Sequence, residues 1–117
     1  MYVPSYQIHL APSFLASFRD LTEHYPRAPR TVNPALESLK QHPEAGSAIP
    51  GWGRRVWKLR INSRDIRRGK RFGFRLIYYL EGTTVYPLII YAKTSQADVS
   101  SQEIMRALRA IGLASEE

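Results

Sequence analysis

The sequence of 117 residues has no cysteine, which excludes disulfides, thiolate catalysis and cysteine-based zinc sites together. Long hydrophobic runs are also absent: the longest, residues 85–92, has the length of a strand and falls far short of the ~20 residues of a membrane-spanning helix. The first residues show no basic region followed by an apolar stretch, so no signal peptide is expected. These absences predict a cytoplasmic protein that forms one domain over residues 1–117 and does not enter a membrane.

Metal-binding patterns are missing as well. The three histidines, at positions 9, 24 and 42, are far apart in the sequence, and no His, Asp or Glu pair has the spacing of metal ligands. Two glycine-containing segments, 51–53 and 69–73, match no phosphate-binding nucleotide loop, and we interpret their glycines as turn formers. We therefore expect no metal and no other cofactor.

Charge is present in quantity, but it is unevenly distributed. The segment from Arg54 to Arg75 holds ten of the 17 Lys and Arg residues and a single acid, Asp65. The remainder has seven basic and nine acidic residues, so the formal net charge of +7 comes from this segment alone. A concentrated positive patch attracts polyanions, and nucleic acid is the commonest polyanion that a small basic protein meets.

The hydrophobic pattern predicts an α+β fold in the order β-α-α-β-β-β-α, with two N-terminal helices packed on a small antiparallel sheet and a short C-terminal helix. The expected strands are residues 6–10, 55–62, 71–80 and 84–91. The expected helices run from Pro12 to the Tyr25-Pro26 pair, from Thr31 to Gln41, and from a capping box at Ser100 and Glu103 to Gly112. Residues 81–83 have the length of a hairpin turn, and residues 44–53 are interpreted as a loop that enters the sheet.

Strand alternation brings several cations together. Residues two apart on a strand share a face, so Lys58 and Arg60 project together while the apolar residues between and beside them project to the opposite side. Arg75 lies on the neighbouring strand and Lys93 follows the last one, so we expect these four side chains to converge. Four converging cations suit a phosphodiester, because arginine grips two phosphate oxygens in a fork and lysine acts as a compact charge or a base.

Crowding by like charges favours the neutral form of a lysine, which makes Lys58 the candidate general base. The alternative interpretation of the same cations is a solvated outer face of the sheet that keeps the protein soluble. Trp52 and Phe72 could stack on bases, although loop-anchoring contact with the core is the more common role of such residues.

An ordered set of motifs resembles bacterial toxins of the RelE/ParE superfamily, and the pattern is most similar to the HigB-like members. The set consists of Trp57-Lys58-Leu59-Arg60, Gly69-Lys70, Gly73-Phe74-Arg75-Leu76-Ile77-Tyr78-Tyr79 and Tyr91-Ala92-Lys93. The resemblance covers nearly the whole chain, including the acidic and serine-rich start of the last helix. It implies a toxin of a type II toxin-antitoxin system, held inactive by a cognate antitoxin protein.

In RelE-type members this resemblance implies a ribosome-dependent mRNA endonuclease that works without metal: the ribose 2′-OH attacks the adjacent phosphate and the 5′-oxygen leaves. By matching motif positions, the expected catalytic residues are Lys58, Arg60, Arg75 and Lys93. The expected RNA-binding residues are Arg55, Arg64, Arg67, Arg68, Lys70, Arg71 and Tyr91. The ribosome and mRNA are the expected partners beside the antitoxin.

The sequence departs from the family pattern at one position and leaves two other functions open. Ser100 stands where the best-known members carry a tyrosine that stacks on a base, and Tyr91 or Tyr79 could take its place. ParE-like members of the same superfamily poison DNA gyrase and cleave no RNA, and the fold does not separate the two activities. A non-catalytic nucleic-acid-binding module would instead show steeply salt-dependent binding without cleavage.

Overall fold

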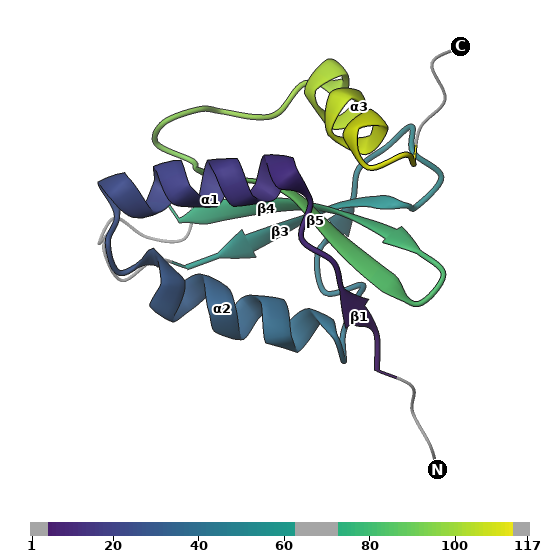
Figure 1. Cartoon of the computed structure of the whole chain (residues 1–117), viewed down its shortest axis with the longest axis horizontal. Helices are drawn as coiled ribbons and strands as arrows, with labels where there is room; N and C mark the ends of the chain where they lie inside the picture. The colour runs from purple at the N-terminus through teal and green to yellow at the C-terminus, as the bar shows by residue number, and fades with distance from the viewer. Residues whose placement is uncertain (1–4, 63–72, 114–117) are drawn as a thin grey trace.

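The computed structural model describes residues 5–62 and 73–113 of the chain. In chain order its elements are β1 (Gln7–Ile8), α1 (Pro12–His24), α2 (Ala28–Leu39), β2 (Ser47–Ala48), β3 (Val56–Ile61), β4 (Phe74–Glu81), β5 (Thr84–Ala92) and α3 (Ser101–Ala110). Figure 1 shows α1 and α2 running side by side along the strands, with α3 beyond the start of α1. This confirms the expected α+β fold of three helices and one sheet.

The strands form one sheet in the order β1-β5-β4-β3-β2. The pairs β2–β3, β3–β4 and β4–β5 are antiparallel, but β1 runs parallel to β5, with Gln7 opposite Thr84. The expectation of a purely antiparallel sheet was therefore wrong at this edge. Parallel pairing between elements so far apart leaves no turn signal in the sequence, whereas the hairpin between β4 and β5 does.

The expectation that residues 44–53 form only a loop was also wrong. Ser47 and Ala48 form β2 and pair with Lys58 and Trp57 of β3. A two-residue strand is too short to show a period of two, so the pattern could not reveal it. The glycine before it is required by close packing, because a Cβ at Gly46 would lie 2.5 Å from the carbonyl oxygen of Lys58.

Helix boundaries agree with the sequence reasoning except at the start of α2. That helix begins at Ala28, three residues before the expected Thr31, because a proline at its first turn suits a helix start. It ends at Leu39, and a turn follows. The capping box of α3 is confirmed: the Glu103 N–H donates to Ser100 Oγ at 3.1 Å, and the Ser100 N–H donates to Glu103 Oε1 at 3.3 Å.

The two faces of the sheet are covered differently. One face packs against α1 and α2 through a continuous apolar cluster. Its fully buried members include Phe14, Val32, Leu39, Phe74, Leu76 and Tyr78. The other face is covered by α3 over only part of its area, through Ile104, Ala107 and Leu108. Within the described residues, no helix is long and apolar enough to cross a membrane.

Candidate nucleic-acid interface

β3 presents its cations on the less covered face. Trp57 and Ile61 are buried in the cluster beneath α1 and α2, and Leu59 packs against that cluster. Lys58 and Arg60 alternate with these residues, so they project to the opposite side, as the sequence predicts. Lys58 is half-buried and Arg60 is exposed. The apolar side chains therefore pack the strand against the main core, while the two cations point away from that core.

The strand register aligns two arginines and a tyrosine across the sheet. Arg60 of β3 is directly opposite Arg75 of β4, and Arg75 is directly opposite Tyr91 of β5. Like charges directly opposite one another on paired strands are destabilising. An arrangement that places Arg60 beside Arg75, with Lys58 two residues along the same face, favours the binding of an anion between them.

Arg75 is the buried member of this row. It is 4% exposed, and one of its guanidinium nitrogens, Nη1, donates to the carbonyl oxygen of Phe74 at 3.1 Å. Burial lowers the pKa of Arg75, and the neighbouring charge of Arg60 acts in the same direction. Arginine nevertheless stays charged in proteins. Arg75 is therefore a fixed, buried positive charge on the same face of the sheet as Arg60.

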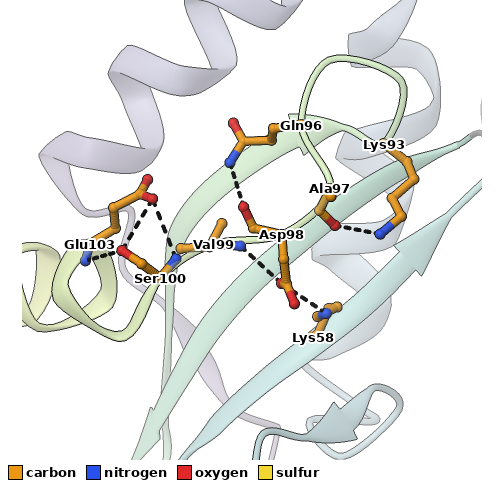
Figure 2. A network of polar contacts seen from close by, with 8 residues as sticks. All are labelled: Lys58, Lys93, Gln96, Ala97, Asp98, Val99, Ser100 and Glu103. Atoms are coloured by element: carbon orange, nitrogen blue, oxygen red, sulfur yellow. Dashed lines mark hydrogen bonds and ion pairs between the residues drawn. The ribbon is translucent and has the colours of Figure 1, made fainter.

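Lys93 lies just beyond β5, where its backbone N–H donates to the carbonyl oxygen of Gly73 at 3.0 Å. The charge of Lys93 acts on the Asp98 carboxylate, which places its ammonium near that residue. Its ammonium donates to the carbonyl oxygen of Ala97 and helps to shape the connection to α3 (Figure 2). The expected convergence of the four cations therefore holds for Lys58, Arg60 and Arg75, with Lys93 at the edge of the group.

A half-open groove of about 490 Å³ lies beside these cations. One wall is the segment 45–50, which contains β2; the floor is formed by Lys58, Leu59 and Arg60; and the other wall is Asp98 with Val99. The strand that the sequence reasoning missed is thus a wall of the site. The close approach of this wall to β3 requires a glycine at position 46, which also lines the groove.

The structure adds an acid that the sequence reasoning did not include. Asp98 Oδ1 accepts a hydrogen bond from Lys58 Nζ at 3.1 Å and another from the Val99 N–H at 2.9 Å (Figure 2). The bond from Val99 lowers the pKa of Asp98, and Lys58 lowers it further. Asp98 stands two residues before the cap of α3, so its acidic character was visible in the sequence but its partner was not.

Tyr91 places a buried hydroxyl at the end of the arginine row. The residue is 5% exposed, and its hydroxyl makes no hydrogen bond of ordinary geometry within the described part of the chain, although the Asp98 carboxylate is close enough to interact with it. Burial raises the pKa of Tyr91 to about 12, and the negative charge of Asp98 contributes in the same direction. A buried ring cannot stack on a base, so Tyr91 offers a hydroxyl rather than an aromatic face in this conformation.

The other expected RNA-binding residues fall into two groups. Arg64, Arg67, Arg68, Lys70 and Arg71 lie outside the described residues. Arg55 lies before β3, five residues from Arg60, which at about 3.3 Å per residue is roughly 16 Å away along the strand. There its guanidinium donates to the Tyr79 hydroxyl at 3.3 Å and pairs with Glu81 at 3.5 Å.

Two further side chains considered for base stacking are held by the protein. Tyr79 is 6% exposed, and its hydroxyl donates to Glu81 at 3.1 Å. Trp52 packs against the cluster beneath α3. In the described parts of the chain no three His, Asp or Glu side chains gather in a way that could hold a metal ion.

No protein-family model matches this sequence, and a search of curated proteins finds no match either. Solved structures do match. One is the E. coli toxin RelE, in a mutant with two arginines changed to alanine and in the free state. It is similar over 92% of this chain and 98% of its own, with a TM-score of 0.57 at 17% sequence identity. The chain therefore has the fold of RelE.

Proposed function

We propose that the protein is a RelE-like toxin that cleaves mRNA on the ribosome and so inhibits translation. The observation that carries this proposal is the alignment of Arg60 with Arg75 in the sheet, together with the groove that Arg60 and Lys58 line. Two arginines directly opposite each other repel, whereas the binding and stabilisation of a phosphodiester is favoured by such charges. The RelE fold supports the same reading by analogy.

In the proposed reaction the ribose 2′-oxygen attacks the neighbouring phosphorus, and the bond from phosphorus to the 5′-oxygen breaks. Arg60 binds the phosphate oxygens, where negative charge increases in the transition state, and the buried charge of Arg75 opposite it adds to the positive potential there. Lys58 was the candidate base in the sequence reasoning, but it donates to Asp98 at 3.1 Å. We therefore assign Lys58 the role of a charge on the phosphate, with Lys93 at the edge of the site, and the reaction needs no metal.

The proposed partners follow from the same surface. An exposed cationic groove is a natural target for an acidic or partly disordered inhibitor segment that folds on binding, which is the part an antitoxin protein would play. The ribosome and mRNA would be met in the cytoplasm. Purification together with the neighbouring genes of the operon is expected to recover a small acidic protein, and its absence would count against the antitoxin.

The test is to induce the chain in growing bacteria and to map the 5′ ends of cellular mRNAs. New ends inside translated codons are expected with the natural sequence and not with Arg75→Met, which keeps the length of the side chain but removes its charge. Growth arrest with intact mRNA and DNA damage would contradict cleavage and indicate a gyrase poison instead. If neither growth arrest nor mRNA cleavage is observed, a non-catalytic binding module is the function that remains.

A further inference from the structure

The groove contains one carboxylate among its described lining residues, and that carboxylate touches the central lysine. Asp98 lines the groove together with Lys58 and Arg60, and its Oδ1 lies 3.1 Å from Lys58 Nζ. The carboxylate is 65% exposed, so a bound RNA could reach it. An acid at this place weakens the attraction of the groove for phosphate, which calls for an explanation beyond charge balance.

The position of Asp98 is determined by its own segment as well as by Lys58. Its backbone carbonyl oxygen accepts from Gln96 Nε2 at 2.9 Å, and its side chain accepts from the Val99 N–H at 2.9 Å (Figure 2). The capping box of α3 begins two residues later at Ser100. These contacts hold the carboxylate at the groove wall, while Lys58 reaches it from β3 on a flexible side chain.

The reaction needs a group that can accept a proton, and the groove offers few. Arginine does not lose its proton in proteins, which excludes Arg60 and Arg75. Lys58 Nζ is already engaged as a donor to Asp98 at 3.1 Å. Its partners keep the Asp98 carboxylate in the unprotonated form that a general base requires, and they also lower its pKa, so its strength as a base comes from its position rather than from its basicity. Asp98 is the acceptor that remains among the described residues of the groove.

Distance also favours Asp98. In a conformer ready for attack, the 2′-oxygen lies about 3 to 3.5 Å from the phosphorus atom. A phosphate oxygen bound by Lys58 would thus bring the adjacent 2′-hydroxyl close to a carboxylate that is itself 3.1 Å from the Lys58 ammonium. The same ion pair can therefore bind the phosphate with one member and meet the nucleophile with the other.

We propose that Asp98 is a catalytic residue, the general base that takes the proton of the attacking 2′-hydroxyl. The bond from the 2′-oxygen to phosphorus forms, the bond to the 5′-oxygen breaks, and the leaving oxygen takes a proton from solvent water. Asp98 returns its proton to solvent after the products leave, so no oxidant, metal or further reactant is needed. This inference rests on the proposed function, since it assigns a role within that reaction.

The experiment measures single-turnover cleavage of mRNA in programmed ribosomes at saturating protein, together with the Kd for a mRNA whose 2′-hydroxyl is replaced by hydrogen. Asp98→Asn and Asp98→Ala are expected to lower the cleavage rate by on the order of 10²- to 10⁴-fold. The Kd is expected to stay the same or to fall, because a negative charge leaves the groove. Sodium formate, a small carboxylate, is expected to restore part of the rate of Asp98→Ala.

Two controls separate this role from a structural one. Glu37→Gln removes the acid of another exposed lysine pair, Glu37 with Lys40 at 3.1 Å on the surface of α2, and is expected to cleave at the natural rate. Asp98→Asn keeps an acceptor for the Val99 N–H, so its thermal midpoint is expected to match that of the natural sequence. If Asp98 merely positioned Lys58, adding Asp98→Ala to Lys58→Met would change nothing and formate would have no effect.

The inference would be overturned if Asp98→Ala had no effect in the Lys58→Met background and formate gave no rescue. It would also be overturned by a natural cleavage rate in both Asp98 variants. Each leaves the proposed function intact, because the natural protein still cleaves. If the natural protein and Glu37→Gln both fail to cleave programmed mRNA, the proposed function is wrong and the role of Asp98 falls with it. A further loss on adding Asp98→Ala to Lys58→Met, with rescue by formate, would support the general base.

Discussion

The same three strands build two unlike surfaces. On one face, Trp57, Phe74 and Leu76 are buried under α1 and α2 in a continuous apolar cluster. On the other face, the alternate positions carry Lys58, Arg60, Arg75 and Tyr91, and α3 covers only part of the area.

The first face follows the ordinary rule that apolar area is removed from water. The second follows the same rule under α3, where Val56 and Ile77 are buried, but beside the groove it also buries an arginine opposite another arginine and next to a tyrosine hydroxyl. Features that lower stability and cluster beside a groove are typical of binding or catalytic sites, and they support the proposed function.

The largest effect is expected on the apolar face. Phe74 is fully buried, so Phe74→Ala should lower the free energy of unfolding by about 3 to 5 kcal/mol, through lost transfer energy and the cavity left behind. Urea unfolding followed by circular dichroism measures this value. A loss below about 1 kcal/mol would mean that this face does not dominate stability, and the contrast between the faces would fail.

The next residue along β4 should behave in the opposite way. Arg75→Met removes a charge held under the groove, so cleavage should fall by on the order of 10²- to 10³-fold, the usual result of removing one preorganised donor. The free energy of unfolding should change by about 1 kcal/mol or less, because burying a charge is itself unfavourable. Quantitative cleavage and urea unfolding of one preparation test both parts, and a large loss of stability would contradict the division between faces.

The buried hydroxyl of Tyr91 should make the stability of the protein depend on pH in the alkaline range. The pKa of Tyr91 is raised from 10.0 to about 12, so between those values the folded protein keeps a proton that the unfolded chain loses. Folding is therefore favoured fully below pH 10, and stability falls as pH rises through this window, by about 2 to 3 kcal/mol in all.

Tyr91→Phe should remove this part of the pH dependence. At pH 7 it should be as stable as the natural sequence or slightly more so, because a poorly hydrogen-bonded buried hydroxyl is removed. Urea unfolding at pH 7, 9.5 and 11.5 compares the two proteins. Parallel losses of stability in both at high pH would show that folding does not raise the pKa of Tyr91.

The smallest effect is expected at the helix cap beside the groove. Ser100→Ala removes the acceptor for the Glu103 N–H and should lower the free energy of unfolding by about 1 kcal/mol. If Ser100 serves only as a cap, the cleavage rate at saturating RNA should stay within about twofold, well below the effects of catalytic donors. Ser100→Thr, which also caps helices, is the matched control, and a large rate loss in Ser100→Thr would assign the hydroxyl a role at the site.

By itself, the sequence determined what depends on neighbours along the chain. Three local patterns each predict one structure. They are the alternation of Lys58 and Arg60 with apolar residues, the hairpin turn at residues 81–83, and the capping box of Ser100 and Glu103. Uneven charge was equally plain, because counting residues requires no structure. These features were enough to predict the α+β fold and the face that carries the cations.

Tertiary structure decided what depends on register and on distant segments. The alignment of Arg60 with Arg75 and Tyr91 follows from how three strands slide past one another, which a period of two does not specify. The parallel pairing of β1 and the short β2 arise from contacts with no turn between them. Asp98 meets Lys58 across 40 positions of the chain, because α3 packs where it does and fixes the segment before it. Local patterns place a side chain on a face, but only packing determines which charge it meets there.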